Sequence, residues 1–427
     1  MSSADRIKAP RGTFDVLGEQ SAARAVLEER ARAILEGAGY ERIETPAFEA
    51  TELFARGVGD STDIVRKEMY TFADASGRSL TLRPEGTAPV CRAYVEHGMH
   101  KLRQPVRLWY LSSFFRHERA QAGRYRQFWQ VGAEALGSED PAVDAESICL
   151  LAALLDELNV APVRLRLSSL GSLAARNEYR EQLQAHLRAH AEGLSAEVRE
   201  RIELNPLRAF DSEHPGTRAV MERAPRLLDF LDAEDAEHFA EVRARLDGAG
   251  VAYEIDPTLV RGLDYYTRTV FEFTSEQLGA QSGVGGGGRY DGLVEQLGGA
   301  PTPGIGWAAG IERILLAGSA PHPAPVPVDL FVAYELAHEG DSPARRHAPA
   351  GAFALLTEAR AAGLTAQMEL AGRSLKGQLG YANALEARYV AILGAGETVL
   401  KDMLGGGQQT VAADAVVHAV LRGLRSL

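Results

Sequence analysis

The sequence predicts an α+β protein with a mainly antiparallel sheet, a helical insertion and a small α/β domain at its C-terminal end. Three observations lead to this prediction. Short segments between about 69 and 135 alternate polar with apolar residues and are separated by turns, which favours antiparallel strands. Residues from about 172 to 248 are rich in Arg, Glu and Ala at helical spacing. A proline-rich segment, 319–328, is followed by alternating strand-like and helix-like segments.

The first element is an expected helix at 20–39, whose apolar residues recur at helical spacing and which stops at Gly37 and Gly39. Residues 41–50 predict a strand that carries Pro46. Since proline cannot donate to a sheet ladder, this strand is expected at an edge or an interface. The short strands that follow are expected at 69–72, 79–82, 106–115 and 128–135.

The helical insertion interrupts the sheet. A helix at 142–158 and a strand at 163–167 precede it, and its own bounds are about 172–248. The sheet is then expected to resume with strands at 251–255 and 269–273, and 304–316 has the pattern of a strand that turns into a helix.

The length of 427 residues suggests two or three domains. We expect the first domain at 1–320, a proline-rich linker at 321–327 and an α/β domain at 328–427. The elements of this last domain are expected as strand 328–334, helix 349–362, strand 364–370, helix 373–386, strands 388–394, 397–403 and 408–412, and helix 413–424.

Composition excludes several classes of protein. The longest charge-free stretch, 296–311, is broken by prolines and glycines, so no transmembrane helix is expected, and the N-terminus lacks the apolar segment of a secretory signal. Two cysteines, Cys91 and Cys149, are too few for a disulfide framework or a structural zinc site and favour small core residues in a reducing cytoplasm.

Charge is distributed unevenly along the chain. The net charge of -12 excludes a basic coat for nonspecific binding of nucleic acid. Residues 101–130 nevertheless carry seven Lys or Arg and a single acid, Glu118. A solvated helical face would interleave both signs, so this local excess favours an anionic ligand.

The glycine run formally matches a nucleotide-binding pattern at Gly283, Gly285 and Gly288. A dinucleotide loop must follow a strand and open a helix, whereas the residues that follow here, 289–292, have the composition of a turn. We therefore do not expect a Rossmann site. A binding loop whose backbone approaches a ligand closely remains open.

The segment 114–137 predicts a hairpin with arginines at its base and in its loop. Arg116 could place two donors on a phosphate, and Phe128 could stack on a base. The alternative is a surface hairpin with ordinary salt bridges.

Several motifs together resemble a known family. FRHE at 115–118 with Arg124-x-x-x-Phe128 is similar to motif 2 of class II aminoacyl-tRNA synthetases, GIGWAAGIERILL at 304–316 to motif 3, and Pro46 to the motif 1 proline of the dimer interface. Three further segments resemble histidyl-tRNA synthetases: TLRPEGTAPVCRAYVEH (81–97), LVRGLDYYTRTVFEF (259–273) and GGGRYDGLVEQLGG (286–299). GRSLKGQLGYANALEARYVAILG (372–394) is typical of the anticodon-binding domain of that family.

The resemblance implies ATP-dependent attachment of L-histidine to tRNA(His) through a histidyl-adenylate, with release of AMP and pyrophosphate, by a cytoplasmic homodimer without a membrane partner. It implies that Arg116 holds the ATP α-phosphate, Arg313 the γ-phosphate, Glu118 the adenine amino group and Phe128 the adenine ring. Mg²⁺ would bridge the β- and γ-phosphates as a mostly water-ligated ion, and no protein residue is assigned to it.

For the amino acid, the resemblance implies that Glu85, Thr87 and Gln130 take the α-amino group. It further implies that Glu134 and Tyr266, with Tyr265 nearby, read the imidazole nitrogens. Arg261 is the distinctive residue of the family, an arginine that faces the α-phosphate and acts in catalysis together with Arg116.

The sequence departs from the usual family pattern at Ala120, Trp129, Gly285 and Thr267, none of which is a phosphate-binding arginine. Ala120 puts in doubt only the contacts of the motif 2 loop with tRNA. Taken singly, the tyrosines could be half-buried strand residues and Glu134 a salt-bridge partner.

Two other functions compete with the enzyme. A non-catalytic paralogue, resembling the regulatory subunit of ATP phosphoribosyltransferase, would generally lack the anticodon-binding domain and parts of the histidine signatures. The chain keeps both, and it keeps Arg116, Arg261 and Arg313, which favours the enzyme. A pure RNA-binding module leaves the imidazole-reading residues unexplained.

Overall fold

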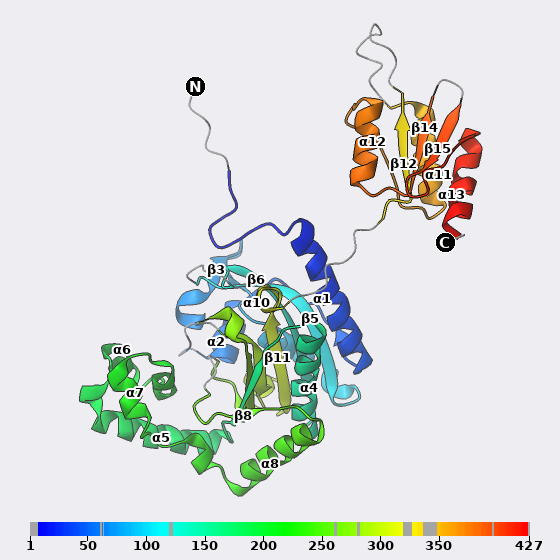
Figure 1. Cartoon of the computed structure of the whole chain (residues 1–427). Helices are drawn as coiled ribbons and strands as arrows, with labels where there is room; N and C mark the ends of the chain where they lie inside the picture. Colours follow the sequence, from blue (N-terminus) through cyan, green and yellow to red (C-terminus); the bar gives the residue numbers. More distant parts are fainter. Residues whose placement is uncertain are drawn as a thin grey trace, which may run out of the picture. The chain divides into compact units, whose positions relative to one another are not determined.

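The structure is a computed structural model that describes residues 7–59, 62, 64–118, 123–259, 263–279, 282–318, 327–335, 348–394 and 397–425. The chain forms two compact units, Met1–His322 and Pro323–Leu427. Figure 1 shows both units and the element labels used below. Most of the expected linker, 321–327, lies outside the described residues.

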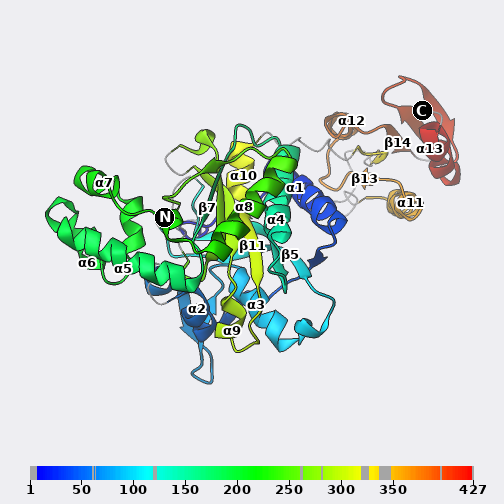
Figure 2. The ribbon, with the colours of Figure 1, turned by 90° about the horizontal axis from the view of Figure 1, so that it is seen from below.

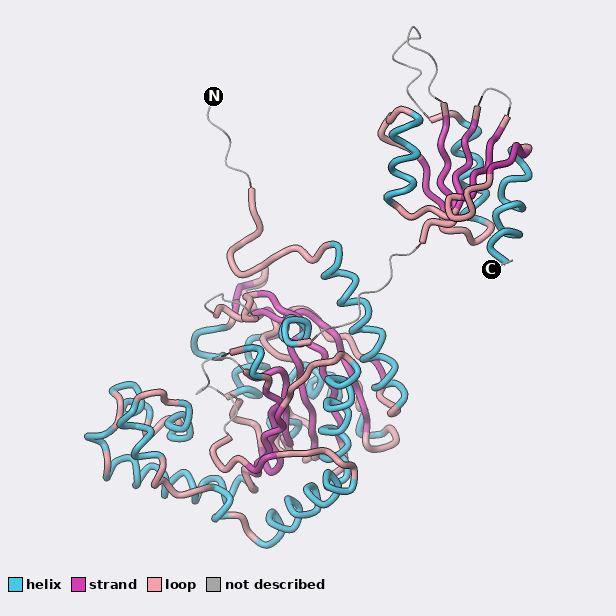
Figure 3. The backbone as a smooth tube through the Cα atoms, in the orientation of Figure 1, coloured by secondary structure: helices cyan, strands magenta, loops and turns pink. Residues whose placement is uncertain are grey.

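The centre of the first unit is a sheet of eight strands in the order β1-β5-β6-β11-β10-β9-β7-β8. Its strands are β1 (Glu41–Arg42), β5 (Val106–Phe115), β6 (Gln127–Leu136), β7 (Arg164–Ser169), β8 (Glu254–Ile255), β9 (Thr267–Thr274), β10 (Gly283–Arg289) and β11 (Gly304–Gly310). Only the two edge pairs, β1 with β5 and β7 with β8, are parallel. The other pairs are antiparallel, so the expected mainly antiparallel sheet is confirmed. Figure 3 shows its strands in magenta.

One face of this sheet is covered by helices. These are α1 (Gly18–Gly37), α4 (Pro141–Glu157), α8 (Ala233–Gly248) and α10 (Ile311–Ala317). Leu27, Ile148 and Val242 from three of them share a core with Trp109 and Trp307 of the sheet. Helix α4 begins after an aspartate cap, whose Oδ1 accepts a hydrogen bond from the Ala142 N–H at 2.8 Å, and after a proline at its first position.

The opposite face carries a second core and the candidate site. Helices α2 (Thr51–Val58), α3 (Thr87–Glu96) and α9 (Leu293–Gln296) lie on this side. Tyr94 of α3 and Leu293 of α9 join Tyr110, Val270 and Tyr290 in the core. The short elements η1 (Ile64–Glu68), η2 (Met99–Lys101) and η6 (Glu276–Leu278) connect the larger ones.

The helical insertion leaves the sheet after β7 and returns to it at β8 (Figure 2). It contains α5 (Leu173–Ala189), η3 (Ala191–Gly193), α6 (Ala196–Arg201), η4 (Pro206–Asp211), α7 (Pro215–Met221), η5 (Leu227–Phe230) and the covering helix α8. Tyr179, Leu183 and Leu187 of α5 are buried against Val198 and Leu207. The helices from α5 to α8 therefore match the expected insertion.

The expected strand at 41–50 is wrong as a single element. Residues 41–42 form β1 of the large sheet, whereas β2 (Phe48–Ala50) joins β4 (Ser79–Leu82) and β3 (Tyr70–Ala73) in a separate sheet of three strands. Pro46 lies between the two pieces, where it interrupts no ladder.

The turn expected after the glycine run is observed at residues 291–292, but the run itself is not a loop. It forms β10, which pairs with β9 and β11. A Cβ on Gly287 would lie 1.9 Å from the Gly306 carbonyl oxygen, and one on Gly288 would lie 2.5 Å from the Thr269 carbonyl oxygen. Glycine is therefore required here because the neighbouring strands approach closely.

The second unit contains a sheet of five strands in the order β13-β12-β14-β15-β16. Its elements are β12 (Leu330–Tyr334), α11 (Ala350–Ala361), β13 (Ala366–Met368), α12 (Leu375–Ala384), β14 (Tyr389–Leu393), β15 (Thr398–Asp402), β16 (Gln408–Val411), η8 (Ala413–Ala415) and α13 (Val416–Arg425). The unit has its own core, to which Val332, Leu355 and Val420 belong.

None of the helices in the described ranges is long and apolar enough to cross a membrane.

Candidate active site

A cavity of about 250 Å³ lies against the large sheet of the first unit. Strands β5, β6, β9, β10 and β11 and the first turns of α3 and α10 contribute to its walls. Its lining includes nearly all of the site residues expected from the sequence: Glu85, Thr87, Arg116, Glu118, Phe128, Gln130, Tyr265, Tyr266 and Arg313. Residues separated by more than 200 positions in the chain therefore share one cavity.

One end of the cavity is strongly basic. The Arg116 guanidinium lies 3.8 Å from Glu118 Oε1, and the Arg124 guanidinium lies 3.4 Å from Glu118 Oε2. Arg313 reaches the same end from α10 and donates to the carbonyl oxygens of Gly123 and Gly283. Two of these guanidinium groups therefore pair with Glu118, and the third is held by backbone carbonyl oxygens at the same end of the cavity.

Backbone contacts fix the orientation of these arginines. Arg116 Nε donates to the Pro84 carbonyl oxygen at 2.9 Å, and its guanidinium lies 5.3 Å from the centre of the Phe128 ring. Burial, together with the nearby charge of Arg124, lowers the pKa of Arg313, but a guanidinium remains a cation at neutral pH. A flat aromatic ring beside fixed cations suits a nucleotide with its phosphates.

The other end of the cavity is built around Glu134, a fully buried carboxylate on β6. It accepts hydrogen bonds from Thr87 Oγ1 at 2.8 Å, from the Tyr110 hydroxyl at 3.3 Å and from the Tyr290 hydroxyl at 2.7 Å. A Cβ on Gly306 would lie 1.7 Å from Glu134 Oε2, so only glycine at that position of β11 leaves room for the carboxylate.

Burial raises the pKa of Glu134 to about 8, although hydrogen bonds from Tyr290 and Thr87 favour the ionised form. Burial likewise raises the pKa of Glu85 to about 7, against the backbone N–H groups of Ala88 and Thr87. One carboxyl group in the cavity lining and one buried behind it thus hold protons close to neutral pH, which is frequent where polar groups recognise a ligand.

The family model described as histidyl-tRNA synthetase matches residues 12–314. A histidine--tRNA ligase of Halorhodospira halophila is 48% identical over 436 residues, covering 98% of this chain and 98% of that protein. One of Desulforamulus reducens is 45% identical over 413 residues, covering 96% and 97%.

The crystal structure of the apo histidyl-tRNA synthetase of S. aureus is 35% identical, with a TM-score of 0.77, and covers 97% of this chain and 100% of that chain. The chain belongs to the histidyl-tRNA synthetase family. A structure described as an ATP phosphoribosyltransferase regulatory subunit/histidyl-tRNA synthetase from Bacillus halodurans is 22% identical with a TM-score of 0.64, a likeness that shows only the fold. The paralogue is therefore not favoured.

Within this histidyl-tRNA synthetase fold, two expected residues are not among the described residues that line the cavity. Glu134 lies behind the lining residues Thr87 and Tyr110, to which it is hydrogen-bonded. Arg261 lies outside the described residues. Ala120, the departure in the motif 2 loop, lies outside them as well.

Glu85 and Gln130 differ in how their side chains are engaged. The Glu85 carboxylate accepts hydrogen bonds from the N–H groups of Thr87 at 2.7 Å and Ala88 at 3.1 Å, so it caps the start of α3. Gln130 Oε1 is buried and has no hydrogen-bond partner among the described residues. A buried acceptor without a partner is costly, which favours a ligand group at this position.

Sequence reasoning missed several residues of the site. Tyr110 and Tyr290 are buried partners of Glu134, and Arg124 joins the basic end. Tyr290 stands within a segment that resembles the family, and Tyr110 stands within a correctly expected strand, two signals that could have marked both residues as candidates. The described lining residues that were not expected also include Tyr125, Glu272 and Glu312.

Proposed function

We propose that the chain activates L-histidine with ATP and transfers the histidyl group to tRNA(His). Family membership supports this proposal, and one observation carries it: a single cavity joins a basic end, with Arg116 and Arg313, to a polar end built on the buried Glu134. ATP phosphates and an imidazole are the ligands that these two ends suit.

At the polar end, Glu134 and Tyr266 would hydrogen-bond the two imidazole nitrogens of histidine, with Tyr265 packed against Tyr266 at 4.8 Å between ring centres. Gln130 Oε1 would accept from the α-amino group, since it is a buried acceptor that no described residue satisfies. Thr87 would join it there. Glu85 would act through its negative charge, because its oxygens already accept backbone hydrogen bonds.

At the basic end, Arg116 would hold the α-phosphate and Arg313 the γ-phosphate, while the adenine ring stacks on Phe128 and its amino group meets Glu118. The histidine carboxylate would attack the α-phosphorus in line, and pyrophosphate would leave. No covalent enzyme intermediate is needed, so the residues act by positioning and by stabilising the growing phosphate charge. Arg261 would complete this set from the opposite side of the α-phosphate.

Mg²⁺ is proposed as the ion that accompanies the nucleotide. No group of three or more His, Cys, Asp or Glu side chains in the described part of the chain is placed to hold a metal. Mg²⁺ that is bound by phosphates keeps several waters and needs only one or two carboxylates. Glu272 of β9 lines the cavity near the basic end and would supply one of them.

We propose a catalytic domain at 1–320, a linker at 321–327 and a third segment, 328–427, that forms the C-terminal domain. In the transfer of histidine to tRNA(His), this last domain would bind the anticodon stem. Every described residue that lines the cavity belongs to the first unit, and the C-terminal unit has its own core. A cytoplasmic location fits two free cysteines, of which Cys91 is buried.

A homodimer is proposed from the small sheet. Its outer face is apolar and carries Phe48 and Phe72, which are 50% and 43% exposed and lie 6.0 Å apart between ring centres. Its inner face carries the buried Thr81. Exposed aromatics gathered on one sheet face mark an interaction surface, and Pro46 leads directly into the strand that bears Phe48.

We expect Phe48→Glu to weaken the dimer, because it places a charge on this apolar face. Sedimentation equilibrium at micromolar protein should then show a fall from dimer to monomer mass. Phe353→Glu is the matched control, since Phe353 is an exposed phenylalanine of the other unit, and it should leave the mass unchanged. A dimer that resists Phe48→Glu together with Phe72→Glu would refute this interface.

The activity itself is tested by histidine-dependent exchange of labelled pyrophosphate into ATP without tRNA. We expect exchange by the wild-type protein, and we expect Arg116→Ala to reduce its rate by about 10²- to 10³-fold, since a fixed donor is lost from the phosphate. Arg78→Ala removes an arginine from the exposed β3–β4 turn and should behave as wild type. No exchange by a folded, dimeric sample would favour the regulatory paralogue.

A further inference from the structure

Two consecutive residues at the end of β10, Arg289 and Tyr290, lie on opposite sides of the sheet. Tyr290 lies in the core on the cavity side of the sheet and donates its hydroxyl hydrogen to Glu134 at 2.7 Å. Arg289, its neighbour, extends to the opposite side and meets Asp144 of α4. This alternation is what a strand imposes, because successive side chains point to opposite faces.

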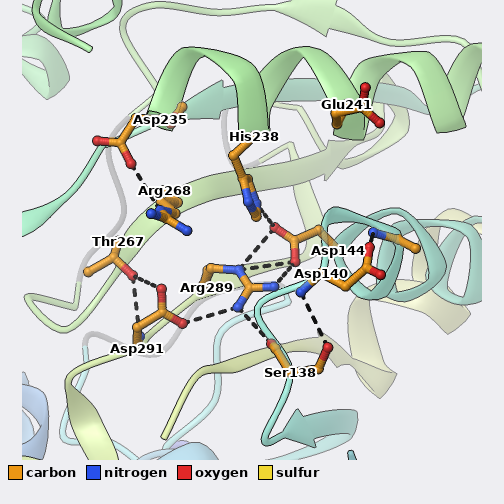
Figure 4. A network of polar contacts seen from close by, with 12 residues as sticks. Ser138, Asp140, Asp144, Asp235, His238, Glu241, Thr267, Arg268, Arg289 and Asp291 are labelled. Atoms are coloured by element: carbon orange, nitrogen blue, oxygen red, sulfur yellow. Dashed lines mark hydrogen bonds and ion pairs between the residues drawn. The ribbon is translucent and has the colours of Figure 1, made fainter. Parts of the chain in front are cut away.

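Arg289 and Asp144 form a fully buried ion pair, with both side chains 0% exposed (Figure 4). Arg289 Nε donates to Asp144 Oδ1 at 3.1 Å, and its other nitrogens donate to Asp144, to the Ser138 carbonyl oxygen at 2.9 Å and to Asp291 Oδ1 at 3.1 Å. His238 of α8 completes the pair, with its Nε2 2.9 Å from Asp144 Oδ2. The guanidinium is thereby fixed in position.

These contacts hold the charges of the network in place. Burial alone would raise the pKa of Asp144, but the hydrogen bond from His238 and the charge of Arg289 outweigh it, and the pKa is lowered. Burial alone would likewise lower the pKa of Arg289, but Asp144 and Asp291 raise it. Asp144 thus remains an acceptor and Arg289 a donor over the whole physiological range.

The backbone around Tyr290 is held from the side of β11 as well. The Tyr290 N–H donates to the Gly304 carbonyl oxygen at 2.7 Å, and the Gly304 N–H donates to Asp291 Oδ1 at 3.2 Å. A Cβ on Gly304 would lie 2.4 Å from the Tyr290 ring. The ring therefore occupies a slot that it fills only while residues 289–291 keep their place.

We propose that Arg289, through its buried pairing with Asp144 and Asp291, is a positioning residue for histidine recognition, because it holds the Tyr290 hydroxyl on Glu134. This inference rests on the proposed function, since Glu134 matters to catalysis only if it reads the imidazole. It extends the histidine site beyond the cavity to the helix-covered side of the sheet. His238 adds a contact from the last helix of the insertion.

The test compares Michaelis constants for histidine and for ATP in pyrophosphate exchange. In the double variant Arg289→Met/Asp144→Leu, apolar side chains replace both charges, because a buried pair replaced as a whole usually leaves a protein folded, whereas one stranded charge does not. We expect the KM for histidine to rise about 10- to 100-fold, as for a buried polar group left without its hydrogen-bond partner, with the KM for ATP within about twofold of wild type.

A cycle with Tyr290→Phe separates positioning from a general loss of structure. If Arg289 acts through the Tyr290 hydroxyl, adding the double variant to Tyr290→Phe should change the KM for histidine by no more than about twofold. Additive effects, or an equal rise of both Michaelis constants, would overturn the proposal. Arg268→Met is the matched control, since Arg268 pairs with Asp235 of α8 at 2.9 Å without leading to the cavity, and it should leave both constants unchanged.

Folding of each variant is checked by thermal denaturation before the kinetics. If the double variant does not fold, Asp291→Asn takes its place, because it keeps the size of the side chain and weakens the contacts to Arg289 and Gly304; the same rise for histidine alone is expected. Wild-type exchange with unchanged constants in the variants would overturn the positioning role alone. A wild-type protein without exchange would overturn the proposed function and this inference together.

Discussion

Glu134→Gln should lower kcat/KM for histidine by about 10³- to 10⁴-fold, because a site built to hydrogen-bond a substrate loses most of its affinity when its own polar groups are left unpaired. The carboxylate accepts from Thr87, Tyr110 and Tyr290 and still has to meet the imidazole. A glutamine offers one acceptor oxygen and turns an amide donor toward these hydroxyl donors. The loss should fall on histidine, and the KM for ATP should change little.

Pyrophosphate exchange at varied histidine and varied ATP measures this split. Glu96→Gln is the matched control, because Glu96 is an exposed carboxylate that pairs with Arg92 at the end of α3. A loss below about tenfold for Glu134→Gln, or one shared equally by ATP, would contradict the assignment of Glu134 to the imidazole.

The pH dependence of stability in the same variant gives a second measurement. Burial raises the pKa of Glu134 to about 8 in the folded protein, above its ordinary value near 4.5. A raised pKa means that the stability contributed by the protonated group is complete below about pH 4.5 and is lost as the pH rises through about 8. Glutamine cannot ionise, so the unfolding free energy of the wild type should fall relative to that of Glu134→Gln between pH 5 and pH 9.

Periodicity predicted those parts of the fold in which local pattern and final environment agree. The strand expected at 106–115 coincides with β5, whose residues alternate between the two cores, and the helix expected at 142–158 differs from α4 by one residue at each end. The α+β class and the helical insertion followed from such segments. In these segments the spacing of apolar residues in the sequence matches the faces that the fold buries.

Periodicity failed where the determining contacts are distant in sequence. The strand β10 has almost no side chains, so no alternation marks it, and the need for glycine arises from β9 and β11. The segment 41–50 has one continuous strand-like pattern, yet its two halves pair with different sheets. Nothing in the local sequence shows whether such a segment pairs with one sheet or with two.

The site shows the same division. Resemblance to motifs named residues such as Thr87 and Arg313, and the fold brings them to one cavity. The partners of Glu134 were not named, because Tyr110 on β5 and Tyr290 after β10 meet it only across the assembled sheet. The residues that hydrogen-bond Glu134 come from separate strands, so no regular spacing in the sequence marks them.

Removal of residues 320–427 should leave histidine activation measurable and reduce tRNA charging by about 10²-fold or more. Every described residue that lines the cavity belongs to the first unit, and that unit has cores of its own that share no residue with Val332, Leu355 and Val420 of the second. We therefore expect adenylation to proceed without the second unit. We expect the transfer of histidine to tRNA to require the second unit, because that unit is proposed to supply phosphate contacts to the tRNA. Each lost contact weakens binding and reduces its dependence on salt.

Two assays on one preparation separate the steps: pyrophosphate exchange for activation, and acylation of tRNA(His) at two salt concentrations for transfer. The truncated protein must first be shown to remain a dimer, because a monomer could lose activation through the small-sheet interface rather than through chemistry. A dimer that exchanges pyrophosphate but charges tRNA poorly assigns the second unit to tRNA binding. Full charging by the truncated dimer would refute that assignment, since the tRNA contacts would then lie within the catalytic unit and its helical insertion.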